Sequence, residues 1–376
     1  MRAVARALAV LHDGAEVCGD DAPAAPLALA KRLRAYADEF EARRETPGTA
    51  VDLQQLLAEQ QRFLIDAIAT LLERAGAGRV RRIHGRTGCR SVWVGPAREV
   101  RFARADPRAH GDVAEDVASL AIDLRARGAP QLAEALAAGY AWAADDYGLY
   151  RVLDGYARDA ALRMALAAAS RAGVESRGPA PAAYLCAALT AVHRAPIVIA
   201  IGGSVASGKS TLAKAVSQRL AAPRVEADRV RRALLEPLPA SVSHERIWEG
   251  DFTERVYRGM LRRAADVLHS GRPVVLDACF PDARRRGEAA ALAARHAAEF
   301  VFVHCDAPPE QVEARLLRRA TRDGGPPGGW PAIAQAVTDT CQPPSPGEPG
   351  RYVRIDTGRP RREWLRALGF GTEARP

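Results

Sequence analysis

The stretch that decides the fold is Ile197–Thr211, IVIAIGGSVASGKST. Its first five residues are apolar and mostly β-branched, which predicts a buried strand of a parallel sheet. The chain then breaks at two glycines and continues as Gly203–Ser210, GSVASGKS, with the spacing G-x-x-x-x-G-K-[ST]. Glycines let the backbone curl so that successive N–H groups point at a phosphate. A helix is expected from Lys209 to about Leu220, with its positive N-terminus directed at the same anion.

A strand before this loop and a helix after it form the context in which the motif binds a nucleotide triphosphate. A chance Gly/Ser-rich turn is the alternative, and that context disfavours it. Lys209 is expected to contact the β- and γ-phosphates, and the Ser210 hydroxyl to bind Mg²⁺. The predicted cofactors are therefore ATP and Mg²⁺. The residues expected to line the phosphates are Gly203, Ser204, Val205, Ala206, Ser207, Gly208, Lys209, Ser210 and Thr211.

The composition indicates a globular protein that suits anionic ligands. The chain has 376 residues, enough for two domains, and 48% of them are hydrophobic. Its net charge of +9 fits nucleotides or a polyanion, although a solvated arginine-rich surface explains it equally well. Nucleic acid is a partner that the sequence permits without favouring, because no aromatic residues interleave with the basic runs.

The six cysteines are widely spaced, without a C-x-x-C pair. This spacing favours small core residues in a reducing compartment over disulfides or metal ligands. No run of residues has the pattern of a signal peptide or a membrane span. A cytoplasmic protein that does not contact a membrane is therefore expected.

The second half of the chain has the pattern of a parallel α/β sheet. Helical runs alternate with strand candidates at Ile197–Ile201, Arg224–Ala227, Pro273–Ala278, Phe300–Cys305 and Tyr352–Ile355. Ligands bind at the carboxyl ends of such strands, so the first polar residue after each strand is a candidate for function.

Two acidic residues that follow these strands are candidates for function, whereas Asp306, after the fourth strand, is expected to start a helix. Asp228 follows the second strand and is placed to orient or deprotonate an acceptor hydroxyl. Arg231 lies one helical turn further on and is placed to hold an anionic group. The alternative for this pair is a helix N-cap with an exposed arginine. Asp277 ends the third strand, where an acid binds Mg²⁺ or its water shell. A turn cap is the alternative there.

Four arginines end a later helix and run into a Gly/Pro-rich loop that reaches Gly329. This arrangement suits a lid that brings guanidinium groups over the γ-phosphate. A basic helix end that complements the dipole explains one or two of them. Spacing alone does not say which of these points inward: Arg315, Arg318, Arg319 or Arg322.

The first half is expected to be mainly helical. Apolar spacing predicts helices over Ala3–Leu11, Leu27–Arg43, Val51–Arg74, Asp112–Arg127, Gln131–Tyr140 and Leu149–Arg171. Short strands are expected at Val80–Ile83, Ser91–Val94 and Glu99–Phe102. We thus expect an α/β chain with a mainly helical lobe at 1–172, a linker and helix at 173–194, and a P-loop NTPase domain at 195–376.

Three segments of this half, ARALAVLHDGA, VRRIHGRTGCRSVWVGP and GDVAEDVASLAIDLRARG, resemble the carboxy-terminal lobe of an aminoglycoside-phosphotransferase-like kinase. That family carries H-G-D-x-x-x-x-N in its catalytic loop and a metal-binding Asp on a nearby strand. Here His84-Gly85 match, but Arg86 stands at the base, Ser91 at the Asn and Arg101 at the metal-binding Asp. The resemblance implies a degenerate lobe, kept as a scaffold, a docking surface or an anion binder through its arginines. His84 is expected to stabilise a turn.

The second half resembles small P-loop kinases of the zeta-toxin, gluconate-kinase and polynucleotide-kinase type. Together the halves are similar to the bifunctional aminoglycoside phosphotransferase/ATP-binding protein family. This resemblance implies that Asp228 is the hydroxyl base and that Arg315 and Arg319 bind the triphosphate. The stretch Glu236–Asp251, where acceptor contacts are expected, matches no known substrate pattern.

The expected function is an ATP- and Mg²⁺-dependent kinase that transfers the γ-phosphate to a hydroxyl of a small-molecule acceptor. Two alternatives stay open at this stage. One is a polynucleotide 5′-hydroxyl kinase, and the other is an ATP-binding regulatory protein without phosphotransferase turnover. Aminoglycoside phosphorylation by the first half is opposed by the cations in its catalytic loop.

Overall fold

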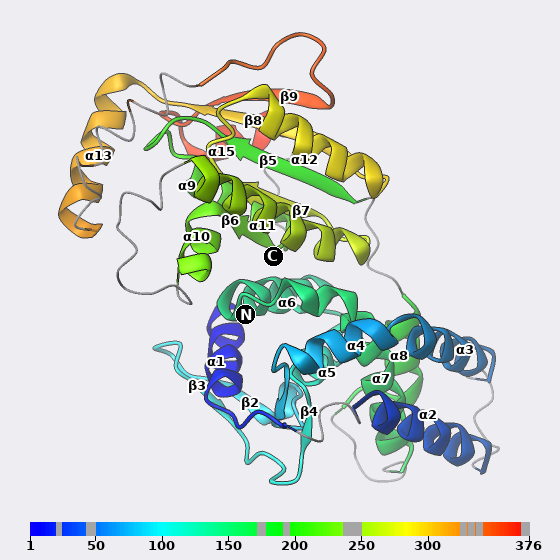
Figure 1. The fold of residues 1–376 in the computed structure, drawn as a ribbon. Coiled ribbons are helices and arrows are strands. Elements are labelled where there is room, and N and C mark those ends of the chain that lie inside the picture. Colours follow the sequence, from blue (N-terminus) through cyan, green and yellow to red (C-terminus); the bar gives the residue numbers. More distant parts are fainter. Residues whose placement is uncertain are drawn as a thin grey trace. The chain divides into compact units, whose positions relative to one another are not determined.

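The computed structural model describes residues 1–19, 25–42, 50–170, 178–190, 196–235, 250–323 and 341–369, together with Gly329 and Gln335. The chain divides into two compact units, Met1–Val192 and His193–Pro376 (Figure 1). The predicted fold class is confirmed, because the first unit is mainly helical and the second contains a parallel sheet. Three predicted features lie partly outside the described residues: 173–177 of the linker, 236–249 of the acceptor stretch and 324–328 of the lid loop.

The first unit is built around helix α5, Ala114–Ala126, which is buried on almost all sides. Its side chains pack against α6, α7 and α8, and small alanines let these helices approach closely. The helices of this unit are α1 (Arg2–Asp13), α2 (Ala25–Ala42), α3 (Ala50–Asp66), α4 (Ile68–Gly76), α5, α6 (Pro130–Ala144), α7 (Leu153–Ala169) and α8 (Pro181–Leu189).

Two short antiparallel pairs of strands flank these helices. Strand β1 (Val80–Arg82) pairs with β4 (His110–Asp112), and β2 (Val92–Val94) pairs with β3 (Val100–Phe102). A 3₁₀ turn, η2 (Cys89–Ser91), leads into β2. The sequence did not predict β4, because the helical spacing of α5 was extended back to Asp112. The helix in fact begins two residues later, and Asp112 accepts a hydrogen bond from the Ala114 N–H at 2.8 Å.

Two predicted helices of this unit have other bounds in the structure. The run Val51–Arg74 is two helices, because the chain makes a turn at Ala67. The run that was expected to start at Leu149 begins with the 3₁₀ turn η3, Tyr147–Arg151, before α7. Asp146 causes this by capping the turn, since its carboxylate accepts the Leu149 N–H at 3.1 Å.

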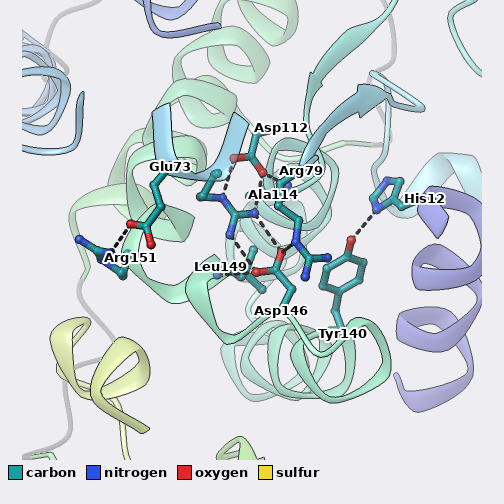
Figure 2. Close-up of polar contacts among 10 residues, drawn as sticks. His12, Glu73, Arg79, Asp112, Ala114, Tyr140, Asp146, Leu149 and Arg151 are labelled. Carbon is teal, nitrogen blue, oxygen red and sulfur yellow. Dashed lines mark hydrogen bonds and ion pairs between the residues drawn. The ribbon is translucent and has the colours of Figure 1, made fainter. Parts of the chain in front are cut away.

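A buried arginine joins α4, β4 and η3, and Figure 2 labels the two carboxylates that it contacts, Asp112 and Asp146. The Arg74 guanidinium donates to both oxygens of Asp112, at 2.6 and 2.7 Å, and to both oxygens of Asp146, at 2.8 and 2.9 Å. All three residues are almost completely buried. Arg79 adds a second positive charge, with its Nε 3.9 Å from Asp146 Oδ2, so two guanidinium groups offset the two carboxylates and the cluster ties the three elements together.

The second unit has a five-stranded parallel sheet in the order β6-β7-β5-β8-β9. Its strands are β5 (Ile197–Gly202), β6 (Arg224–Glu226), β7 (Val274–Asp277), β8 (Glu299–Asp306) and β9 (Arg351–Asp356), so all five predicted strands are present. The helices are α9 (Lys209–Leu220), α10 (Ala227–Leu235), α11 (Gly250–His269), α12 (Ala283–Arg295), α13 (Pro309–Asp323) and α15 (Arg361–Ala367).

Each face of this sheet is covered by a pair of helices. Ile199 and Ile201 of β5 pack with Leu212 of α9 and Trp364 of α15 on one face. Helices α11 and α12 pack against the strands as well, and Arg286 of α12 lies over the ring of Phe302. From β5 the chain first builds β6 and β7 on one side and then crosses to β8 and β9 on the other. Such a switch point opens a crevice at the carboxyl end of the central strand.

Among the described residues, we find no helix with the length and apolar character needed to cross a membrane.

Candidate functional site

The glycine-rich loop leaves β5 at this switch point in a conformation that needs its glycines. Gly203 has φ +133°, and its N–H donates to the carbonyl of Cys279 at 3.0 Å. A Cβ at Gly203 would lie 2.4 Å from the carbonyl oxygen of Cys305. Gly208 has φ +90° and directly precedes α9. The loop therefore curls back tightly above the N-terminus of α9, as a phosphate-binding loop does.

Lys209 begins α9 and is half-buried, and its Nζ donates to the carbonyl of Ser204 in the same loop at 3.0 Å. Burial alone would lower the pKa of Lys209. The Cys279 thiol and the carboxylates of Asp277 and Asp228 more than offset that effect and raise the pKa above its ordinary value. The side chain is thus an ammonium held over the loop.

Ser210 and Asp277 form the acidic side of the site. The Ser210 hydroxyl donates to Asp277 Oδ1 at 3.2 Å, and Asp277 is only 2% exposed. Burial raises the pKa of Asp277 to about 6, although Arg224 and Lys209 oppose this effect. The hydroxyl and carboxylate oxygens are hard donors of the kind that Mg²⁺ prefers, and they lie next to the loop.

The chain supplies few metal ligands of its own. Among the described residues, no group of three or more His, Cys, Asp or Glu side chains could hold a metal ion. A magnesium ion bound through one carboxylate, one hydroxyl and the phosphates of a nucleotide fits this donor set.

Arg224 is a neighbour of this site that the sequence analysis missed. Its Nη1 donates to Asp277 Oδ2 at 3.2 Å, and its Nη2 pairs with Glu226 at 3.0 Å. The period of two in a strand places side chains 224 and 226 on the same face, so the alternation in this short strand was a usable signal. Arg224 thereby fixes the orientation of the Asp277 carboxylate.

Thr357 and Arg315 hold the glycine-rich loop from outside. Thr357 directly follows β9 and is 3% exposed, and its hydroxyl donates to the Ser207 carbonyl at 2.5 Å. Arg315 Nη1, from α13, donates to Thr357 Oγ1 at 3.1 Å and to the Ala206 carbonyl at 3.2 Å. A Cβ at Gly208 would lie 2.7 Å from the Thr357 hydroxyl. Arg315, expected at the triphosphate, thus contacts one carbonyl of the loop itself.

Thr357 was also missed by the sequence analysis. Like Asp228 and Asp277, it lies at the carboxyl end of a strand of the sheet, so the first polar residues after the fifth strand were a usable signal. Those residues are Asp356 and Thr357.

Asp228 lies in the first turn of α10, directly after β6. Its Oδ2 accepts from Arg319 Nη2 of α13 at 3.1 Å, so two of the predicted residues meet here. Arg231 is 9% exposed and lies over the ring of Phe252, 5.9 Å from the ring centroid. Burial lowers the pKa of Arg231. Arg318 is exposed and donates to its own helix at Ala314.

The loop of the first unit that was compared with a kinase catalytic loop, from His84 to Ser91, is held by α5. Asp116 accepts the N–H groups of His84 and Gly85, at 2.7 and 2.9 Å, so this carboxylate holds the turn. Arg86 is exposed and pairs with Asp106 at 3.3 Å. Arg101, the expected position of the metal-binding Asp, lies exposed in β3. The carboxylate that faces position 86 is therefore that of Asp106, and the resemblance to a kinase lobe stays a prediction.

Comparisons with known proteins agree with this description of the second unit. A model of the AAA domain family matches residues 198–332. Uncharacterised proteins of Mycobacterium tuberculosis and Mycobacterium bovis are 31% identical over 267 residues, which cover 66% of this chain and 50% of theirs. The chain thus spans about half the length of the curated relatives it matches.

Solved structures similar to this chain include two kinases. A gluconokinase from Sinorhizobium meliloti 1021 is 24% identical, with a TM-score of 0.33, and covers 47% of this chain and 93% of its own. The APS kinase of Mycobacterium tuberculosis, in complex with AMPPNP and APS, is 22% identical, with a TM-score of 0.33, and covers 46% and 98%. The glycine-rich loop, the parallel sheet and the family match together define a P-loop domain in the second unit.

Proposed function

We propose that the second unit is an ATP- and Mg²⁺-dependent kinase that transfers the γ-phosphate to a hydroxyl group of a small-molecule acceptor. The observation that carries this proposal is the convergence of three groups at the carboxyl edge of the sheet. They are the ammonium of Lys209, the Ser210–Asp277 pair and the carboxylate of Asp228. Phosphoryl transfer needs a phosphate anchor, a metal ligand and a base, and these residue types supply them.

The loop residues Gly203–Thr211 bind the phosphates through their N–H groups and through Lys209. Ser210 and Asp277 hold Mg²⁺, which neutralises charge on the phosphate oxygens when it is bound. Arg224 keeps Asp277 oriented, while Thr357 and Arg315 keep the loop in shape.

Asp228 is the base in this proposal. The acceptor oxygen attacks the γ-phosphorus and forms the new O–P bond while the bond to the ADP leaving group breaks. The hydroxyl proton passes to the Asp228 carboxylate. Arg319, which now pairs with Asp228, supplies a guanidinium to the phosphoryl group in transfer, and Arg231 is assigned to an anionic part of the acceptor.

The test is a screen of hydroxyl-bearing metabolites and oligonucleotides with γ-labelled ATP. Lys209→Ala should reduce phosphoryl transfer on the order of 100-fold or more, because it removes a charge aimed at the transition state. Lys214→Ala is the matched control, since Lys214 is an exposed lysine on the same helix. Undiminished transfer by Lys209→Ala would refute the site, and undiminished transfer by Asp228→Asn would refute the base.

One outcome of the same screen separates the kinase from the regulatory alternative. If the wild-type protein binds ATP tightly but neither hydrolyses it nor transfers phosphate to any acceptor, the unit is a nucleotide-binding regulator. Binding is followed with a fluorescent ATP analogue so that it is measured independently of turnover.

A further inference from the structure

Most of the excess positive charge of the chain lies in one segment of the first unit. Residues 79–108 contain nine arginines and two acids, a net charge of +7, against +9 for the whole chain. Arg79 and Arg81 face the body of the unit, where they contact Asp146 and the carbonyls of His12 and Asp13. The other seven arginines are exposed.

This segment is a long two-armed hairpin, which we call the basic hairpin and define as residues 82–108. Hydrogen bonds join its arms from the base, where Ile83 N–H donates to Ala109, to the tip, where Gly95 N–H donates to Glu99. Ala103 N–H donates to Ser91 at 2.8 Å, and β2 and β3 pair beyond that point. The loops that join these strands extend away from the helices of their own unit (Figure 1).

The exposed arginines are spread along both arms and the tip. The first arm carries Arg82, Arg86 and Arg90, the tip Arg98, and the second arm Arg101, Arg104 and Arg108. Within the described residues, the only ion pair made by these seven side chains is that between Arg86 and Asp106, at 3.3 Å. Guanidinium groups repeated along an extended ribbon match a linear polyanion with regularly spaced charges.

An exposed tryptophan lies in the middle of this basic surface. Trp93 is 55% exposed, and its register partner across the ladder is Arg101. Antiparallel partners project their side chains on the same face, so an indole and a guanidinium lie side by side there. Flat aromatic and guanidinium groups between phosphate-binding cations form a stacking platform for unpaired bases.

The base of the hairpin is fixed by carboxylates of α5. Asp116 holds the turn at His84 and Gly85, and Asp123 accepts the Cys89 N–H at 2.7 Å. Arg82, which donates to the Pro107 carbonyl at 3.0 Å, and Arg86, which pairs with Asp106, join the two arms near the base, while the other five exposed arginines take no part in this anchoring. The hairpin is therefore a rigid support whose outer side chains are available to a ligand.

We propose that the basic hairpin binds single-stranded nucleic acid, with its arginines on phosphates and Trp93 stacked on a base. The sequence alone did not favour this partner, because the interleaving of an aromatic ring with the cations is produced by strand register and not by adjacency in the chain. The proposal does not depend on the kinase activity of the second unit.

The test is fluorescence anisotropy with a labelled 20-nucleotide single strand, as RNA and as DNA, titrated with the full chain at several salt concentrations. Arg101→Ala and Arg104→Ala should each weaken binding for all sequences and reduce the salt slope by about 0.7–1. Trp93→Ala should weaken binding about 5- to 150-fold and leave the salt slope unchanged, because stacking carries no charge. Arg6→Ala, an exposed arginine on α1, is the control and should bind as the wild type does.

Four results would overturn the proposal. The first is the absence of binding at low salt, and the second is binding that the hairpin variants leave unchanged although they unfold at the wild-type temperature. The third is capture by vesicles with anionic lipids that depends on the hairpin while the oligonucleotides are not bound, which would make the surface a membrane contact. The fourth is heparin that displaces the oligonucleotide equally well from the wild type and from Trp93→Ala, which would make the surface a general polyanion site.

Discussion

Protonation of Asp277 makes the charge of the candidate nucleotide site depend on pH. Its pKa is raised from 3.8 to about 6 by burial, so between pH 4 and pH 6 the folded state binds more protons than the unfolded state. Stability contributed by this group is therefore present at low pH and is lost as the pH rises through 6. A shift of this size corresponds to about 3 kcal/mol, which is a substantial cost to keep a carboxylate at this position. The cost is consistent with a carboxylate kept for metal binding.

We predict that the magnesium requirement of nucleotide binding changes through the same pH range. A metal ligand must be ionised, so the Mg²⁺ concentration that gives half-maximal binding of an ATP analogue should rise as the pH falls below about 6. Isothermal titration at pH 5.0 and 7.5 measures this. Asp277→Asn should raise the midpoint at both pH values and reduce the dependence to the part that protonation of the terminal phosphate contributes, since that group titrates at about pH 6 as well. An equal midpoint for the wild type at both pH values would contradict the role of Asp277.

Thr357 gives a second prediction at the scale of one residue. Thr357→Val keeps the shape of the side chain but removes the hydroxyl that donates to Ser207 and accepts from Arg315. Leaving these partners unsatisfied costs about 1–3 kcal/mol, so affinity for an ATP analogue should fall on the order of 10-fold. Thr357→Ser, which retains the hydroxyl, should bind within about twofold of the wild type. Equal affinities for Val and Ser would show that the hydroxyl does not position the loop.

At the scale of elements, the first unit depends on the buried cluster around Arg74 (Figure 2). Arg74→Met leaves Asp112 and Asp146 buried without their cation, and we expect a loss of about 3–5 kcal/mol in the free energy of unfolding. Urea denaturation followed by circular dichroism measures it. The matched control is Arg151→Ala, which breaks the exposed pair with Glu73 and should cost less than about 1 kcal/mol. Similar losses in both variants would contradict the assigned role of the cluster.

The elements also show how much the sequence could predict. The apolar run before the glycine-rich loop and the alternation after it predicted the second unit well, because the central strands β5, β7 and β8 are buried on both faces. In the first unit, β4 was missed since His110–Asp112 carries no apolar signal and exists through its pairing with β1. The phosphate loop was predicted from local spacing, whereas Arg224 and Thr357 reach it only through the order of the strands.

At the scale of the molecule, each unit has buried interactions of its own. The ion-pair cluster around Arg74 lies in the first unit, and the apolar cluster that includes Ile199 and Trp364 lies in the second. A ligand stabilises only the unit that binds it, by about 2.7 kcal/mol at one hundred times its dissociation constant. We therefore expect calorimetry of the full chain to show two unfolding transitions that respond to different changes. An ATP analogue with Mg²⁺ should raise one of them, and Lys209→Ala should abolish that rise.

The Arg74→Met variant identifies the calorimetric transition of the first unit without the use of a nucleotide. The variant should lower the transition that the nucleotide does not move, because its partners Asp112 and Asp146 both belong to the first unit. Its affinity for the ATP analogue should equal that of the wild type, since Lys209, Ser210 and Asp277 lie in the second unit. If the nucleotide and Arg74→Met instead shift one shared transition, the two units unfold cooperatively, and the first unit must then contribute to the stability of the nucleotide site.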